Sequence, residues 1–288
     1  MVMRTFVLTI ALCWASAALA DDRPSNAPDT VLVQNGALQL HGLLWHPTGS
    51  GPHPAVLFNH GSGPASDPAR PALLGPAFAR HGYCVLYLFR RGAGLSADQG
   101  TDSETLMNRA FAEHGQQGRN EQQLRLLEVE LTDVLAGLAF LRASPDVDAR
   151  RIAIAGHSFG GQLTLLAVER DADVRAAVVF GAAAKSWSMS PDLRSRLTAA
   201  VERTSAPVFF VHAANDYSVD PGRALSAEMT RLGKSNRVEI YGAVGKSPSD
   251  GHDFVHRGLS VWEADVFAFL DEHTRLDARF ARTMLRLP

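Results

Sequence analysis

Residues 156–160, Gly-His-Ser-Phe-Gly, form the pattern in this sequence with the clearest chemical meaning. They fit Gly-x-Ser-x-Gly, directly after the apolar run 151–155 and directly before a predicted helix over 162–170. In that setting the two glycines allow a strand-to-helix turn too sharp for side chains, and the serine hydroxyl is held out above a sheet. We therefore predict that Ser158 is a nucleophile, and the alternative is a purely structural turn.

A serine nucleophile needs a general base, and the base needs a carboxylate that orients it. After a turn of this kind the expected chain order is serine, acid, histidine. Asp216 comes just after the apolar run 208–212, where a fixed acid is expected. We prefer it to Asp220, which precedes Pro221 and would more naturally cap the helix that follows.

Three histidines follow the acid in the sequence: His252, His256 and His273. His252 lies in the glycine-containing stretch 249–254, which we expect to be a loop before the closing helix. His273 falls at the end of that helix, where a cation interacts favourably with the helix dipole. His252 and His256 have the spacing of two metal ligands on a helix, but no third ligand is suitably spaced. We therefore predict His252 as the base and no metal site.

Hydrolysis also needs hydrogen-bond donors for the negative charge that develops on the substrate oxygen. The glycine-containing turn 59–63 follows an apolar run, and there Gly61 or Ser62 would present a backbone N–H. The N–H of Phe159 would be the second donor of this oxyanion hole. His60 is expected to hydrogen-bond to backbone in the turn and is assigned no proton transfer.

Strand and helix patterns alternate along most of the chain and would position these residues. Asn35-Gly36 indicates a tight turn in an opening β-hairpin. Apolar runs separated by helices are typical of a parallel sheet covered on both faces, so we predict an α/β fold with a mostly parallel central sheet. The predicted strands after the hairpin are 55–58, 83–89, 151–155, 174–180, 207–212 and 238–241, and the predicted helices are 71–80, 121–143, 162–170, 221–232 and 262–273.

Two stretches interrupt this alternation. Residues 97–117 are polar and contain glycine, and residues 185–205 carry Trp187 and Met189 in a mixed helical context. Both follow the expected carboxyl ends of strands, where α/β proteins bind their ligands. We expect both stretches to supply walls of the substrate pocket.

Composition limits the classes of function. The chain has 288 residues, 46% of them apolar and 20% charged, and a formal net charge of −2, which fits one globular α/β domain. It has no basic block to neutralise phosphates, so nucleic acid is not expected as a partner. The glycine-rich stretches 61–64 and 92–94 lack the Gly-x-Gly-x-x-Gly spacing, and no cofactor is predicted. Oligomeric state is not indicated.

The first 20 residues have the pattern of a cleaved secretory signal. Arg4 precedes an apolar stretch over 6–14, and Ala18-Leu19-Ala20 precedes two acids. The apolar stretch is shorter than the roughly 20 residues of a spanning helix, so stable membrane insertion of the mature chain is not expected. We predict that residues 21–288 are exported as a single domain to the periplasm or the medium.

Each of the two cysteines has a simple expected fate. Cys13 would leave with the signal peptide, so the mature chain would form no internal disulfide. Cys84 lies in the apolar run 83–88 and is predicted to be a small buried side chain.

Taken together, these motifs resemble the α/β-hydrolase superfamily, in particular its dienelactone-hydrolase-like branch. The resemblance covers about residues 31–273 and rests on 59–61, 90–96, 156–161, 215–216 and 251–252. It implies a nucleophile, an acid and a base at Ser158, Asp216 and His252, with oxyanion N–H groups near Gly61 or Ser62 and at Phe159.

The resemblance has one departure, because dienelactone hydrolases proper carry a cysteine nucleophile where this chain has Ser158. The serine form is similar to secreted esterases and to the catalytic domain of prolyl-oligopeptidase-type peptidases. We predict hydrolysis of small-molecule carboxylic esters. The alternatives are a serine peptidase of that type and a binding protein that uses a hydrolase fold without its chemistry.

Overall fold

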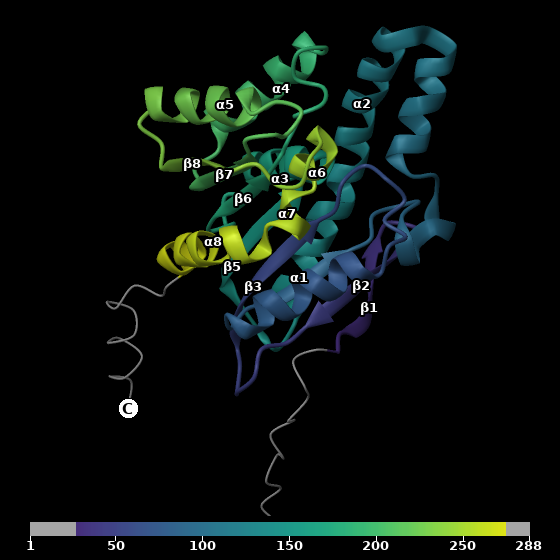
Figure 1. Ribbon diagram of the computed structural model, residues 1–288. Coiled ribbons are helices and arrows are strands. Elements are labelled where there is room, and N and C mark those ends of the chain that lie inside the picture. The colour runs from purple at the N-terminus through teal and green to yellow at the C-terminus, as the bar shows by residue number, and fades with distance from the viewer. Residues whose placement is uncertain (1–26, 275–288) are drawn as a thin grey trace, which may run out of the picture.

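The computed structural model describes residues 27–274 and shows one eight-stranded sheet with helices on both faces (Figure 1). The strands are β1 (Asp29–Asn35), β2 (Leu38–Trp45), β3 (His53–Asn59), β4 (Cys84–Leu88), β5 (Val147–His157), β6 (Ala177–Phe180), β7 (Val208–Ala213) and β8 (Asn236–Tyr241). The helices are α1 (Ala69–Arg80), α2 (Ser103–Ala143), α3 (Phe159–Arg170), α4 (Pro191–Arg203), α5 (Asp220–Arg231), α6 (Pro248–His252), α7 (Phe254–Arg257) and α8 (Leu259–Thr274), with a 3₁₀ helix, η1, at Gly94–Gln99.

The strand order confirms the predicted α/β fold. The order is β1-β2-β4-β3-β5-β6-β7-β8, and every pair from β4 to β8 is parallel. β1 and β2 form the predicted antiparallel hairpin, in which Gly36 has a φ of 57°. Because β3, β5 and β7 run in the same direction, the segments that follow them meet at one edge of the sheet.

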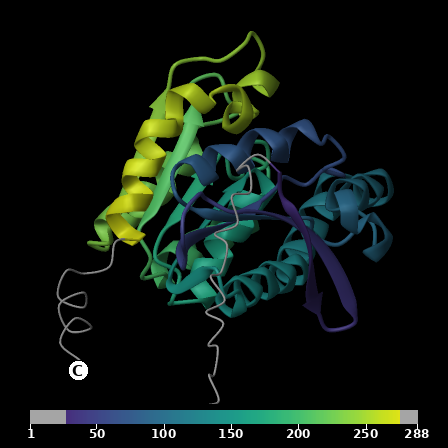
Figure 2. The same ribbon diagram turned by 90° about the horizontal axis from the view of Figure 1, so that it is seen from below.

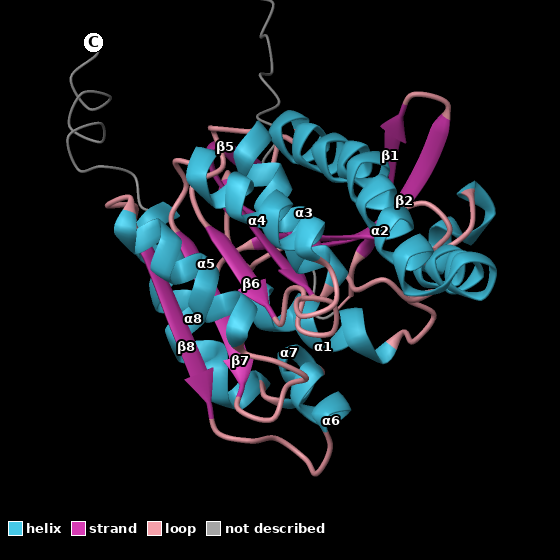
Figure 3. Ribbon diagram, turned by 90° about the horizontal axis from the view of Figure 1, so that it is seen from above, coloured by secondary structure: helices cyan, strands magenta, loops and turns pink. Residues whose placement is uncertain are grey.

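Helices pack on both faces of the sheet because alternate residues of each strand point to opposite sides. On β3, Leu57 packs into the core under α2, α3, α4 and α5, whereas Phe58 packs into the core under α1 and α8. Figures 2 and 3 show these two helical layers from below and from above. The central strands, β3 to β7, are therefore buried on both faces, as their near-continuous apolar sequences require.

The expectation that residues 97–117 interrupt the regular elements is wrong. Apart from η1 and a short link, it belongs to α2, which begins at Ser103 and reverses at Gly115, where φ is 63°. Figure 1 shows the two parts of α2 side by side, and an ion pair of 2.8 Å joins Glu104 to Arg119 across them. The stretch is rich in good helix formers but lacks an apolar stripe, so periodicity did not reveal it.

Cys84 is buried in the middle of the sheet, as predicted, with no solvent exposure. Burial raises the pKa of its thiol to about 12. Between residues 27 and 274, no helix combines the length and apolar character needed to cross a bilayer. The predicted signal peptide, residues 1–20, lies outside the described residues.

Candidate active site

Ser158 occupies a strained turn between β5 and α3. Its φ of 56° and ψ of −116° lie in a region that residues other than glycine rarely adopt. A Cβ at Gly156 would collide with the carbonyl oxygen of Gly160, and a Cβ at Gly160 would collide with that of Asn59. The two glycines therefore permit the sharp turn expected from the sequence.

Three predicted residues meet at the carboxyl edge of the sheet. Ser158 Oγ lies 2.8 Å from His252 Nε2, and His252 Nδ1 lies 2.7 Å from Asp216 Oδ1. Asp216 comes from the turn after β7, where its Oδ1 also accepts a 2.7 Å bond from the N–H of Tyr217. His252 ends the short helix α6 and does not lie in a loop, because the capping box of Ser247 and Asp250 starts a helix there.

Asp216 is bonded by two histidines. Its side chain is 1% exposed, and His212 Nδ1 lies 3.1 Å from Oδ2, the oxygen that His252 does not use. Burial opposes ionisation of this carboxyl group, but the hydrogen bonds from His212 and His252 outweigh burial and lower its pKa to about 2. Asp216 is therefore an anion at neutral pH.

The rival residues lie elsewhere. Asp220 is the first residue of α5, and the start of this helix has no side-chain cap. His256 Nδ1 bonds Asp253 Oδ1 at 2.8 Å, while His273 packs its ring edge against Phe269. His252 and His256 thus have different partners, and no group of three or more metal-ligating side chains lies within residues 27–274.

The turn after β3 places free donors beside Ser158. No acceptor among the described residues bonds the backbone N–H of Gly61, Ser62 or Phe159. Phe159 is the first residue of α3, whose early N–H groups have no partner within the helix. These are the donors that the sequence predicted for an oxyanion.

A buried arginine fixes the direction of that turn. Arg90 has no solvent exposure and donates to the carbonyl oxygens of His60 and Gly61, each at 2.8 Å, and its Nε donates to Glu130 at 2.7 Å. In a trans peptide the N–H points opposite to the C=O. Because Arg90 holds both carbonyl groups, the N–H groups of Gly61 and Ser62 point away from it.

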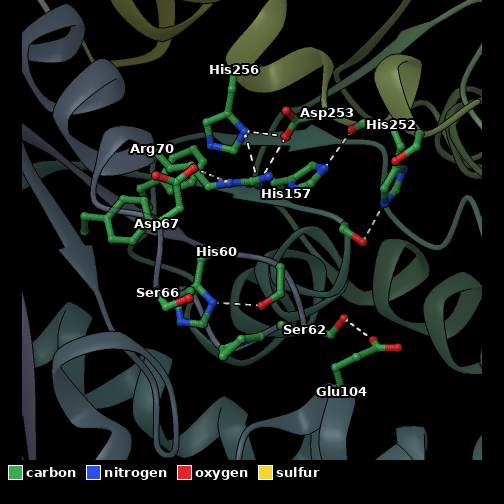
Figure 4. Close-up of a pocket in the computed structure, with 18 of the residues that line it drawn as sticks. His60, Ser62, Ser66, Asp67, Arg70, Glu104, His157, His252, Asp253 and His256 are labelled. Atoms are coloured by element: carbon green, nitrogen blue, oxygen red, sulfur yellow. Dashed lines mark hydrogen bonds and ion pairs between the residues drawn. The ribbon is translucent and has the colours of Figure 1, made fainter. Parts of the chain in front are cut away.

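The start of α2 anchors the same turn from another side. The carbonyl oxygen of Ser62 accepts bonds from the N–H of Glu104 at 2.9 Å and from Ser103 Oγ at 3.0 Å. The hydroxyl of Ser62 donates to Glu104 at 2.7 Å, as Figure 4 shows. The predicted pocket-wall stretch, 97–117, therefore also supports the turn at residues 59–63, which we call the oxyanion turn after its predicted role.

Two buried histidines also support the site. His60 Nδ1 donates to the carbonyl oxygen of Gly61 at 2.8 Å, which matches its predicted role in the turn. His157 Nε2 donates to the carbonyl oxygen of His252 at 2.8 Å and so positions the backbone of that histidine. Burial lowers the pKa of His60 and of His157 well below 6.5, helped by the charge of Arg90 for His60 and by His252 for His157.

Sequence reasoning assigned no role to Arg90, Glu130, His157 or His212. Arg90 and His157 lie inside motifs on which the family resemblance rests, but those motifs do not indicate which groups the two side chains hydrogen-bond. Glu130 had one signal, because it is a charged residue within the apolar face of a predicted helix.

Two cavities meet at Ser158. The large cavity, about 400 Å³, is lined by the oxyanion turn, His252 and a polar cluster that includes Arg70, Asp253 and His256 (Figure 4). The small cavity, about 60 Å³, is lined by Phe159, by both parts of α2 and by the segment 183–189. Lys185 lines both cavities, and its ammonium lies 4.7 Å from the centre of the Tyr217 ring. The two stretches predicted as pocket walls thus both line the small cavity.

Comparison with known proteins supports the fold and a family. The model of the dienelactone hydrolase family matches residues 40–260. A dienelactone hydrolase from Anabaena variabilis superposes with a TM-score of 0.63 and 19% identity, over 88% of this chain and 100% of that one. An esterase from Pyrococcus furiosus gives a TM-score of 0.65 and 14% identity, over 87% and 93% of the two chains.

A longer protein shares the same fold. The acylaminoacyl peptidase of Pyrococcus horikoshii gives a TM-score of 0.63 at 18% identity over 89% of this chain. The match covers 43% of that peptidase, so this chain spans less than half its length.

Proposed function

The chain belongs to the dienelactone hydrolase family of hydrolases, and from this premise we propose that it cleaves carboxylic esters with Ser158 as nucleophile, His252 as base and Asp216 as orienting acid. The substrate is a small molecule, and the reaction passes through an acyl-enzyme. The residues named need no metal or organic cofactor.

Acylation begins when Ser158 Oγ attacks the acyl carbon while His252 Nε2 accepts its proton. Asp216, already an anion, holds the imidazole in the required tautomer and stabilises the imidazolium. The carbonyl oxygen gains a negative charge and is bound by the N–H of Phe159 and that of Gly61 or Ser62. His252 then gives its proton to the leaving alcohol oxygen, and the carbon–oxygen bond breaks.

Deacylation repeats these steps with water. His252 removes a proton from water, and the hydroxide attacks the acyl carbon bound to Ser158. When the acid leaves, the proton on His252 returns to Ser158 Oγ. The enzyme is regenerated with no net change in its charge.

One observation carries the proposal: an unbroken chain of short hydrogen bonds links the hydroxyl of Ser158, through His252, to the buried carboxylate of Asp216. A turn residue held at positive φ has no structural need for such a chain. The free N–H groups at the start of α3 and after β3 supply hydrogen-bond donors for the negative charge that forms on the substrate oxygen.

The experiment that tests the proposal combines active-site labelling with turnover. Ser158→Ala should fold normally, lose labelling by a fluorophosphonate, and lose turnover of p-nitrophenyl acetate by about 10⁴-fold or more. His252→Ala should also abolish labelling, because the serine then lacks its base. His256→Ala is the matched control and should retain labelling, because His256 bonds Asp253 and not Ser158.

A folded Ser158→Ala variant that still hydrolyses esters would refute the nucleophile. If His256→Ala is inactive and His252→Ala is not, the base is wrong. Peptide amides are tested as well. Their efficient cleavage, together with negligible ester turnover, would favour the peptidase alternative.

A further inference from the structure

We propose that the preferred substrate joins a short acyl group, of two to four carbons, to a large alcohol that carries several hydroxyl groups. This inference rests on the proposed function and names the substrate class of the same site. It follows from the way the two unequal cavities meet at Ser158.

The reaction geometry decides which part of the ester enters which cavity. His252 must protonate the leaving oxygen, so the alcohol lies on the side of His252, and the oxyanion lies at the N–H of Phe159. The acyl chain takes the remaining direction. His252 lines the large cavity and does not line the small one. The alcohol therefore occupies the large cavity and the acyl chain the small cavity.

The small cavity limits the length of the acyl chain. Its volume is about 60 Å³, and one water needs about 10–15 Å³ by the same measure, so roughly four to six non-hydrogen atoms fit. Its walls include Met107, which is 3% exposed, and Gln123 and Gln162, which are 5% and 3% exposed.

Hydrogen bonds keep those walls in place. Gln123 Nε2 donates to Gln162 Oε1 at 2.9 Å and to Ser186 Oγ at 3.2 Å, which ties α2 to α3 and to the segment before α4. A longer acyl chain would have to break this buried network and leave its polar atoms without partners. A chain beyond about four carbons should therefore react much more slowly.

The large cavity has the volume of an ordinary ligand site, but about half of its lining is polar, whereas such sites are usually mostly apolar. Lys185 lines this cavity, with its ammonium over the ring of Tyr217. His157 is neutral and donates through Nε2, so its Nδ1 is left as an acceptor beside the cavity. Hydroxyl groups on the alcohol would bond these atoms, whereas an alkyl group would only remove their water.

The experiment compares acyl length and alcohol type separately on the full chain. Among p-nitrophenyl esters, acetate and butyrate should be hydrolysed well, and octanoate should have a kcat/KM about 100-fold lower than butyrate. Among acetates, a monoacetylated hexose should exceed octyl acetate about tenfold in kcat/KM.

Variants of the small cavity test its role directly. Met107→Ala and Met189→Ala should each raise kcat/KM for octanoate relative to acetate, and Met189 is 46% exposed, so its loss does not threaten the fold. The matched control is Met229→Ala, which removes a fully buried methionine of α5 that lines neither cavity and should leave the octanoate-to-acetate ratio unchanged.

Octanoate hydrolysed as fast as butyrate, or an unchanged ratio in the folded Met189→Ala and Met107→Ala variants, would overturn the acyl assignment. Octyl acetate preferred to the hexose ester would overturn the alcohol assignment. In both cases fluorophosphonate labelling of Ser158 would leave the proposed function intact. If a small fluorophosphonate does not label Ser158, the proposed function fails, and this inference fails with it.

Discussion

His60 and His157 are buried next to the reacting atoms, and burial opposes a second proton on either ring. His60 donates through Nδ1 to Gly61 and accepts at Nε2 from the N–H of Arg90 at 3.2 Å, so both nitrogens are used by a neutral ring. A proton added to His60 would also lie beside the guanidinium of Arg90. The site thus relies on two histidines that stay neutral.

These histidines should make folding stability fall in mild acid. In the unfolded chain they take up protons as the pH falls below about 6.5, whereas burial holds their folded pKa well below that value. Protons then favour the unfolded state, so the stability present above pH 6.5 is lost as the pH falls. Each such histidine contributes a slope of up to about 1.4 kcal/mol per pH unit.

Urea unfolding at several pH values between 5 and 7.5 measures this slope. His157→Gln should reduce the slope of stability against pH by the contribution of about one proton. His114→Gln is the control, because the side chain of His114 is 71% exposed and is solvated in both states. Equal slopes for the parent and His157→Gln would contradict the neutral buried ring.

At the residue scale, the site residues that could be predicted differ from those that could not in how far away in the sequence their partners lie. Ser158 was predictable because its motif is local and its neighbours impose the turn. Asp216 and His252 were predictable from chain order and from their places after strands. Arg90 and Glu130 were not, because their roles arise only when segments 40 residues apart pack together, and a buried ion pair has no local pattern.

At the element scale, the oxyanion turn is held between the segment after β4 and helix α2. Arg90→Met should destabilise the protein by about 3–5 kcal/mol, because Glu130 is left as an unpaired buried charge. The double variant Arg90→Met/Glu130→Met should recover most of that stability. Its kcat should stay reduced, by up to about 10²–10³-fold, because the turn no longer aims its N–H groups.

Urea unfolding and ester turnover on the same preparations separate the two effects. Arg91→Met is the matched control, because Arg91 pairs with Asp133 and does not contact the turn. It should cost stability but leave kcat nearly unchanged. Full kcat in the double variant would show that the turn keeps its shape without Arg90.

The start of α2 should act on the same turn. Glu104→Ala removes the partner of the Ser62 hydroxyl and of Arg119, so we expect fluorophosphonate labelling of Ser158 to slow severalfold. Glu113→Ala is the control, since Glu113 lies on the first part of α2 with a side chain that is 69% exposed. Equal labelling rates in the two variants would mean that α2 lines the pocket but that its Glu104 side chain does not support the turn.

The two parts of α2 also show where element prediction reaches its limit. The part after residue 121 has a broad apolar stripe, and its end at Ala143 matches the predicted end. The part before Gly115 packs against the rest of α2 through polar pairs such as Glu104 with Arg119, which leave no apolar period to detect. His252 ends a five-residue helix that is too short to show any period.

At the scale of the whole molecule, the parallel sheet explains why distant residues meet. Strands that run in one direction deliver their carboxyl ends to one edge, so the turns after β3, β5 and β7 adjoin there. That arrangement follows from the alternation of apolar strands and helices, which the sequence displays. The sizes of the two cavities do not follow from it, because they depend on side-chain packing between α2, α3 and the segment 183–189.

Export is the prediction that concerns the whole chain. We propose that residues 1–20 are removed and that the mature protein begins at Asp21, on the pattern of the signal sequence. Fractionation followed by mass spectrometry of the N-terminal peptide should find Asp21 first, outside the cytoplasm. The matched variant Ala18→Arg/Ala20→Arg should block processing. An exported protein that retains Met1 would contradict the proposal.

The buried position of Cys84 makes this protein convenient for chemical labelling. A thiol with no exposure and a pKa of about 12 presents almost no thiolate to a maleimide at neutral pH. In a mature chain without Cys13, a cysteine engineered at the exposed position of Met189, as Met189→Cys, would then react selectively without removal of Cys84. A fluorophore attached there would report directly on what enters the space beside α2.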